Sequence, residues 1–205
     1  MPNSAPPPDR HRQHRPHHIR ESLSSRAAKL ICSLFLTFLL ITAVIVFVLW
    51  LSLRPHRPRF HISSFSAPGL SSGVLRSISF NVSSRNPNRE VGIYYDAISA
   101  SIFYNNDVLG SSPVLFPFYQ PPKNTTAVSG EIDQEELTAA AGKIAVDAAG
   151  GRVGFRLELS STIRFRVSTW DSHHHGMHAT CYVEVGGDGE MLAEYVGRKC
   201  PIYFG

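Results

Sequence analysis

The run from His173 to His178, HHHGMH, brings four imidazole groups close together in the sequence. Imidazoles bind Zn²⁺ or Cu²⁺, and they also titrate together in a mildly acidic compartment. Metal sites of this kind usually combine His with Cys, Asp or Glu at defined spacings, and Asp171 is the only carboxylate nearby. We therefore interpret the run as a solvated loop between two strands, and we predict no metal and no other cofactor.

Catalytic motifs are absent from the sequence. It contains no G-x-S-x-G, G-x-G-x-x-G or H-E-x-x-H pattern, and the residues around Gly142 and Lys143 do not form a phosphate-binding loop. Beyond Leu53, 14 basic residues balance 14 acidic residues, which argues against a nucleic acid partner. We predict that the protein is not an enzyme, has no catalytic residue and binds no nucleic acid.

The surroundings of the remaining reactive groups depend on an apolar span near the N-terminus. The 24 residues from Leu30 to Leu53 carry no charge, and as a helix they would extend over roughly 36 Å, enough to cross a bilayer core of about 30 Å. A buried core helix rarely runs this long without a polar face, and the apolar part of a cleaved signal peptide is only about 7 to 15 residues. We predict a transmembrane signal anchor at residues 30–53 and integration into the lipid bilayer.

Charge predicts how this span is oriented. Six basic residues precede it and three follow within the next six residues, so the positive-inside rule places the N-terminus in the cytoplasm, as in a type II membrane protein. Residues 1–29 hold five prolines and four histidines but few apolar residues, which predicts a disordered basic tail. Residues 54–59, RPHRPR, predict a stiff stalk, and residues 60–205 the external domain.

Cysteine chemistry follows from this topology. If the C-terminal part is external, Cys181 and Cys200 are the only two cysteines in an oxidising compartment, and we predict a disulfide between them; the alternative is two separate buried thiols. Closing a loop of 18 intervening residues would contribute about 3 kcal/mol in the chain-entropy description. Cys32 is near the cytoplasmic end of the span, where it is either inert packing or a palmitoylation site.

Two glycosylation sequons lie in the part that is predicted to be external. They begin at Asn81 and at Asn124, and none occurs in the N-terminal tail. Asn81 falls inside a strand-like run, so Asn124 is the favoured acceptor.

Period-two patterns beyond Phe60 predict the fold. Val153–Val167, VGFRLELSSTIRFRV, alternates apolar and polar residues, as a strand with one buried face does. Its length predicts a bend or bulge near Ser160 and Ser161, or a strand that passes from one sheet edge to another. Similar runs give a count of about seven strands, which is typical of an all-β antiparallel sandwich. The other predicted strands are residues 60–65, 74–83, 124–132, 179–185 and 197–203.

The stretch between Asn86 and Gly110 shows a change of parity. Asn86-Pro87-Asn88 predicts a turn, after which Val91, Ile93 and Tyr95 share one face, whereas Ile98, Ala100, Ile102 and Tyr104 continue the apolar face in the other parity. A one-residue insertion near Asp96, a β-bulge, would produce this change. Residues 105–107, Asn-Asn-Asp, then predict a polar turn, so we interpret the stretch as a bulged hairpin within the scaffold.

One helix is predicted outside the span, at Asp133–Ala148, because an Asp cap, acids in the first turn and a following Gly150-Gly151 pair delimit it. The Pro-rich segment from Pro113 to Pro122 is predicted to be an edge or an exposed loop, and therefore a better candidate for partner contact than the strands. Most of the aromatic residues near it are expected in the core: Tyr94, Tyr95, Tyr104, Phe116, Phe118 and Tyr119.

Several segments together resemble a plant family. They are RPRF at Arg57, FNVSSRNPN at Phe80, GIYYD at Gly92, FYQPPKNTT at Phe118 and IRFRV at Ile163, with a single span before them and the late cysteines after them. Residues 30–205 are in this respect similar to the harpin-induced, non-race-specific disease resistance-like membrane proteins. These carry a late-embryogenesis-abundant group 2 domain, which is related to the water-stress and hypersensitive-response domain.

The resemblance implies a fibronectin-III-like sandwich outside the plasma membrane and a role in defence or stress, by binding rather than catalysis. Protein partners in immune signalling or the cell wall are expected on this basis, as a signalling or adhesion component. The alternative is a structural protectant of membrane or wall during water stress that has no specific partner. Some members end in a hydrophobic tail for a lipid anchor, whereas this sequence stops at Gly205, so no glycosylphosphatidylinositol anchor is expected.

Overall fold

A computed structural model describes residues 23–52, 55–72, 75–133, 144, 147–148 and 150–205. The chain divides into two compact units, residues 1–52 and 53–205, which we describe separately. In the first, helix α1 runs from Leu23 to Ser52, with all its described side chains exposed except the half-buried Ser25. Among the described residues it is the one helix long and apolar enough to cross a membrane. It begins seven residues before the predicted span because LSSRAAK also favours a helix.

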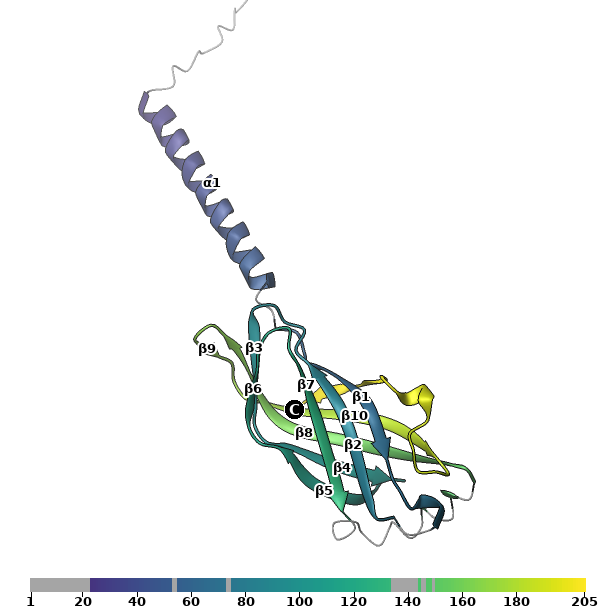
Figure 1. Cartoon of the computed structure of the whole chain (residues 1–205). Helices are drawn as coiled ribbons and strands as arrows, with labels where there is room; N and C mark the ends of the chain where they lie inside the picture. Colours follow the sequence, from purple (N-terminus) through teal and green to yellow (C-terminus); the bar gives the residue numbers. More distant parts are fainter. Residues whose placement is uncertain (1–22, 53–54, 73–74, 134–143, 145–146, 149) are drawn as a thin grey trace, which may run out of the picture. The chain divides into compact units, whose positions relative to one another are not determined.

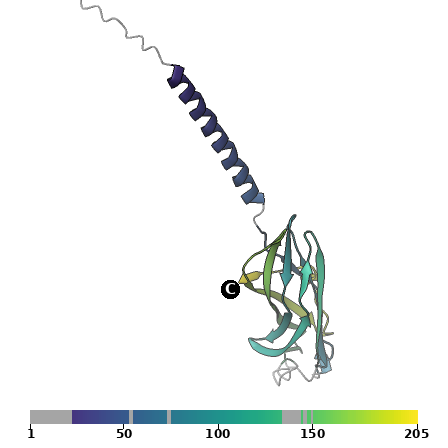
Figure 2. The same ribbon diagram turned by 90° about the vertical axis from the view of Figure 1, so that its left-hand side faces the viewer.

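The second unit is an antiparallel β-sandwich, as predicted (Figures 1 and 2). Its smaller sheet has the strand order β11-β1-β2-β7. The bounds are β1 Arg59–Ser66, β2 Ser77–Arg85, β7 Thr125–Asp133 and β11 Lys199–Cys200. Short 3₁₀ helices lie at η1 Leu70–Ser72 and η2 Ala193–Tyr195.

The larger sheet is built around the 16-residue strand β8. On one side β8 pairs with β10, which in turn pairs with β12. On the other side β8 pairs with β3 and with β4. The outer partner of β3 is β6, the outer partner of β4 is β5, and β9 pairs with the C-terminal end of β8. The bounds are β3 Val91–Tyr95, β4 Ile98–Tyr104, β5 Asp107–Leu115, β6 Phe118–Gln120, β8 Arg152–Val167, β9 Trp170–Asp171, β10 His175–Gly186 and β12 Ile202–Phe204.

Strands β3 and β4 run one after the other along the same edge of β8, and the bulge predicted near Asp96 separates them. Tyr95 is opposite Ile163 and Ser99 is opposite Ser160, so β8 uses one residue fewer between the two pairs. The backbone N–H of Asp96 donates to the carbonyl of Thr162 at 2.9 Å. The extra residue lets apolar side chains of both parities face the core, which confirms the prediction.

The turn after β4 is confirmed as well. Asn105 and Asn106 connect paired residues Tyr104 and Asp107, and their φ angles are 44° and 70°. A two-residue hairpin turn of this kind needs positive φ at both positions, which Asn tolerates better than most residues do. Asp107, predicted as part of the turn, is the first residue of β5.

Two predicted segments differ from the structure. Residues 197–203 form two short strands in different sheets, β11 and β12, because Pro201 between them has no N–H for a continuous ladder. Strand β10 begins at His175, four residues before the predicted start. Most of the helix predicted at Asp133–Ala148 lies outside the described residues; Asp133 itself ends β7, and Ile144 and Ala148 are buried in the core.

A cluster of three buried amides lies where β1, β3 and β7 begin, and we call Asn86, Asn88 and Gln120 the polar clamp. The Asn86 side-chain nitrogen donates to the carbonyls of Val91 at 2.9 Å and Pro121 at 3.1 Å. Its side-chain oxygen accepts from the backbone and the side chain of Asn88. These bonds connect the turn after β2 to the start of β3 and to the segment after β6.

Asn88 extends the clamp to the segment that precedes β1. Its side-chain oxygen accepts from the backbone N–H of His56 at 2.7 Å, and its side-chain nitrogen donates to the carbonyl of His56 at 2.9 Å. His56 follows Ser52, the last residue of α1, by only four positions. Part of the predicted stalk is therefore docked on the sandwich rather than free.

Gln120 completes the clamp from inside the sandwich. It is fully buried; its side-chain nitrogen donates to the carbonyl of Ser84 at 2.8 Å and to the hydroxyl of Thr126 at 3.1 Å, and its oxygen accepts from the hydroxyl of Tyr95 at 3.3 Å. A buried amide is tolerated when its polar atoms have partners.

We expect Ile102→Ala to lower the free energy of unfolding by about 2 to 4 kcal/mol, because this fully buried side chain of β4 would leave a cavity. Urea or thermal denaturation measures the loss, and Ser99→Ala on the outer face of the same strand is the control. Unchanged melting of Ile102→Ala would show that the Asn86–Gly110 stretch is not part of the scaffold.

We expect Asn88→Ala to cost about 2 to 3 kcal/mol, because it leaves buried polar partners unpaired, and to release the segment that contains His56. Limited proteolysis with mass spectrometry should show faster cleavage between residues 53 and 59. Arg89→Ala, at the exposed neighbouring residue, is the matched control. Equal cleavage rates for both variants would contradict a docked stalk.

Candidate functional site

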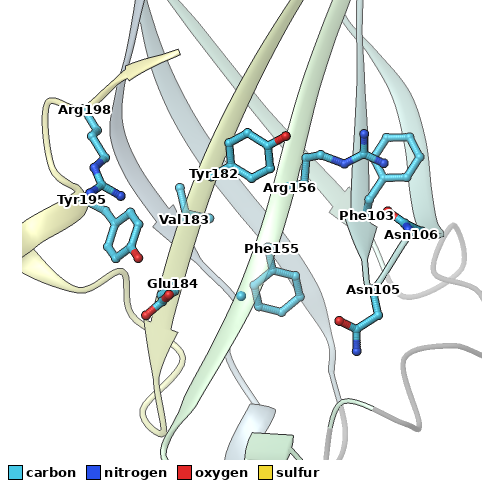
Figure 3. A pocket seen from close by; sticks show the side chains of 11 residues that line it. Phe103, Asn105, Asn106, Phe155, Arg156, Tyr182, Val183, Glu184, Tyr195 and Arg198 are labelled. Atoms are coloured by element: carbon cyan, nitrogen blue, oxygen red, sulfur yellow. The ribbon is translucent and has the colours of Figure 1, made fainter. Parts of the chain in front are cut away.

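A groove of about 340 Å³ opens on the outer face of the larger sheet, and we call it the outer groove (Figure 3). It draws residues from β4, β8 and β10, from the turn between β4 and β5, and from the segment around η2. The lining residues are Phe103, Asn105, Asn106, Gly154, Phe155, Arg156, Tyr182, Val183, Glu184, Tyr195 and Arg198.

Strand alternation places these side chains. In β10, Cys181, Val183 and Val185 are buried in the core, so Tyr182 and Glu184 point outward. In β8 the same alternation turns Arg156 to the outside between the buried Phe155 and Leu157. The groove therefore lies on the polar side of strands that the core holds in place.

Two arginine–aromatic pairs form the sides of the groove. The Arg156 guanidinium lies over the ring of Phe103, 4.1 Å from its centre, and the Arg198 guanidinium lies over Tyr195 at 4.5 Å. Figure 3 shows these pairs on either side of Tyr182, whose side chain is 59% exposed. Stacked arginines keep their N–H groups free to donate in the plane of the guanidinium.

Gly154 leaves the middle of the groove open. It occupies an outward position of β8 between Arg152 and Arg156, and a Cβ placed on it would meet no atom within 4 Å. Any larger residue at this position would fill part of the groove.

Charges around the groove are largely compensated. Arg152 lies 3.7 Å from Glu184 and 3.2 Å from Glu194, and Arg156 lies 3.9 Å from Glu158. The Tyr195 hydroxyl hydrogen bonds to Glu184, and this carboxylate raises the pKa of Tyr195. A ligand would therefore meet aromatic faces and hydrogen-bonding groups more than net charge.

Two tyrosines with altered pKa values lie in the core rather than in the groove. Burial raises the pKa of Tyr104 to about 12, and its hydrogen bond with Asp147 adds to the increase. Burial also raises the pKa of Tyr95, whose hydroxyl contacts Ser84 and Gln120. Both side chains are neutral structural hydrogen-bonding groups.

The groups that line this groove are suited to non-covalent contact. Its lining residues include no Ser, Cys or His. Exposed rings, planar guanidinium groups and the amides of Asn105 and Asn106 are suited to a partner with flat apolar faces and polar edges.

The structure joins Cys181 of β10 to Cys200 of β11, so the disulfide links a strand of the larger sheet to one of the smaller sheet. Both cysteines are 1% exposed. Cys32 is an exposed free cysteine of α1.

The two sequon asparagines differ in accessibility. Asn124 is exposed just before β7, where its side-chain oxygen accepts from the N–H of Thr125. Asn81 is half-buried on the outer face of β2, a central strand with Ser64 and Ser129 opposite it. Asn124 is thus the more accessible of the two asparagines.

The histidine run lies only partly in a loop. His173 and His174 are exposed ahead of β10, whereas His175 and His178 belong to the strand. The ring of His178 lies 3.3 Å from a carboxylate oxygen of Glu158 and 3.0 Å from the Ser160 hydroxyl. No group of three or more His, Cys, Asp or Glu side chains within the described ranges could hold a metal ion.

The Pro-rich segment lies at sheet edges, as predicted. Pro113 is in β5, which pairs only with β4, and β6 lies at the end of the larger sheet. The prediction that most of the nearby aromatic residues are in the core is wrong, because only Tyr95 and Tyr104 of the six are buried. Phe116 is 89% exposed, Tyr119 is 42% exposed, and Tyr94 and Phe118 are half-buried in β3 and β6, at one end of the larger sheet.

Sequence reasoning missed the outer groove, because its residues come from four separate segments. One signal was available: Tyr182 in CYVEV has the parity of the polar face, where a large aromatic residue is unusual.

The sequence of the chain is similar to those of known plant proteins. The family profile described as late embryogenesis abundant protein matches residues 81–181. The chain is 31% identical to Protein NDR1 of Arabidopsis thaliana over 184 residues, which cover 82% of this chain and 80% of that protein. It is 27% identical over 192 residues to NDR1/HIN1-like protein 26 of the same plant, with 87% and 90% covered.

Proposed function

We propose a function for the chain from the premise that it belongs to the NDR1/HIN1-like family of plant defence and stress proteins, which carry a late embryogenesis abundant domain. The protein is a single-pass component of the plasma membrane, and its sandwich acts outside the cell by binding a partner. The four predicted segments, residues 1–29, 30–53, 54–59 and 60–205, serve as cytoplasmic tail, anchor, stalk and binding domain.

The apolar helix supports the anchor. From Leu30 to Leu51 α1 carries no charged side chain and its side chains are exposed within its own unit, so its apolar surface needs an apolar environment. Lipid provides that environment, and the basic residues ahead of Leu30 favour a cytoplasmic N-terminus.

The chemistry of the sandwich supports an extracellular position for this domain. A Cys181–Cys200 disulfide persists in an oxidising compartment, and Asn124 is accessible to the glycosylation machinery of the secretory route. Both features suit an extracellular domain.

The outer groove is the single observation that supports the proposal that the protein acts by binding a partner. A protectant without a partner would need only a stable, soluble surface. Here an arginine–aromatic pair lies on either side of the exposed Tyr182, and Gly154 leaves an open position in the same groove, so aromatic surface stays uncovered.

For the topology, we expect protease added to intact cells to remove a C-terminal tag and to spare an N-terminal tag. Glycosidase should increase the electrophoretic mobility of the protein, and Asn124→Gln should reduce that shift. Cleavage of the N-terminal tag from outside would contradict the orientation.

For the groove, we expect Gly154→Leu to reduce capture of extracellular partners by proximity labelling at least about fivefold, with an unchanged or higher melting temperature. The new side chain would occupy the groove without a backbone clash, and Leu suits a strand better than Gly does.

Gly187→Leu is the matched control, because its Cβ also meets no atom within 4 Å and Gly187 does not line the groove. If Gly154→Leu leaves both the labelled partners and the defence or drought phenotype unchanged, binding through the groove is wrong. A diffuse labelling pattern for the wild type would favour the protectant function instead.

A further inference from the structure

A second groove, of about 420 Å³, lies at the start of β1 and is lined by basic residues. We call it the basic groove, and its lining includes His56, Arg57, Arg59, Lys199, Pro201 and Ile202. Arg57, Arg59 and Lys199 are exposed, whereas Pro201 and Ile202 contribute apolar surface. No acidic residue is among the residues that line it.

Strand pairing brings like charges together beside this groove. Arg59 of β1 is directly opposite Arg85 of β2. Like charges at directly opposite positions of antiparallel strands destabilise a sheet. The side chains of Arg59 and Arg85 therefore repel each other. A Ser or Thr at either position would remove this repulsion.

The described part of the chain places no ion-pairing carboxylate beside these basic side chains. Within the part of the chain that the structure describes, Arg57, Arg59, Arg85 and Lys199 form no ion pair with Asp or Glu. Arg57 lies over the ring of Phe204 at 4.9 Å, and Arg85 reaches only the hydroxyl of Thr125 at 3.5 Å. By contrast, Arg152, Arg156 and Arg166 each have an acidic neighbour within 4.0 Å.

The spacing of the positive charges indicates the shape of the anion. Arg57 and Arg59 are two residues apart, roughly 6 to 7 Å along an extended chain, and Lys199 lies on the neighbouring strand. A single phosphate would need donors that converge on one point, often backbone N–H groups. Exposed side chains spread along a groove suit separate negative charges on an extended ligand.

We propose that the basic groove binds a polyuronate, an acidic polysaccharide with a carboxylate on each sugar ring. Arg57, Arg59 and Lys199 hold successive carboxylates, and Pro201 with Ile202 contacts the apolar faces of the rings. Guanidinium groups can take carboxylates in bidentate fashion. The ligand class rests on the proposed extracellular position of the sandwich, since polyuronates are wall polymers, but the site is separate from the outer groove.

The hydrogen bonds of Asn88 hold part of the basic groove in place before a ligand binds. The two hydrogen bonds between the Asn88 side chain and the His56 backbone fix the residue that precedes Arg57. Strand β1 begins at Arg59, two residues after Arg57. Less conformational freedom is then lost on binding than with a flexible basic stalk.

Binding can be measured with the full chain in neutral-lipid nanodiscs and a fluorescent oligogalacturonate. We expect saturable binding that weakens as salt rises and that disappears when the carboxylates of the probe are methyl-esterified. Arg59→Gln and Lys199→Gln should each weaken binding about threefold, and the double variant about tenfold. Arg76→Gln, which removes one exposed charge elsewhere, should leave the affinity unchanged.

Arg59→Gln should also keep or raise the melting temperature of the unliganded protein, because it removes the repulsion with Arg85. This separates lost binding from lost folding. Equal binding of the methyl-esterified probe, or equal weakening by Arg76→Gln, would overturn the proposal. Binding of a soluble inositol phosphate without binding of oligogalacturonate would also overturn it, since a lipid headgroup would then be the anion. Failure here leaves the topology and outer-groove tests unaffected.

Discussion

The position of the chain segments at one end of the sandwich depends on burying three amide side chains without leaving a polar atom unpaired. An unpaired buried amide group costs about 1 to 3 kcal/mol, so the clamp tolerates few alternative arrangements. Asn86, Asn88 and Gln120 can be satisfied together only if the segment at His56, the start of β3 and the turn into β7 are all in place. The clamp thus couples the entry into β1, and with it the basic groove, to the strands of the larger sheet.

The sequence predicts those features that depend on local pattern. Alternation in β8 and the change of parity at Asp96 follow from which side chains must be buried, and both predictions are confirmed. The bulge predicted near Ser160 and Ser161 is absent from the pairing of β8 with β10, where the register is continuous; the extra residue lies in the neighbouring segment at Asp96. Asn105 and Asn106 are recognisable because few residues accept positive φ. Such features can be recognised without knowing which strands are neighbours.

What could not be predicted depends on pairing between distant segments. The amides of Asn86 and Asn88 read as an ordinary polar turn, since their partners at His56, Gln120 and Pro121 lie up to 35 positions away. Each groove combines side chains that are unremarkable in their own segments. Arg59 and Arg85 become a like-charge pair only once the register of β1 and β2 is known.

The C-terminal strands have a consequence for the order of assembly during synthesis. Strand β11 completes one edge of the smaller sheet and β12 one edge of the larger sheet, and Cys200 of β11 supplies half of the disulfide. A ribosome that has translated β1 through β10 has therefore produced two sheets, each with one strand missing. Pairing of these two edge strands and formation of the Cys181–Cys200 disulfide must wait until residues 199–204 leave the exit tunnel, so both sheets receive an edge strand from the same short segment.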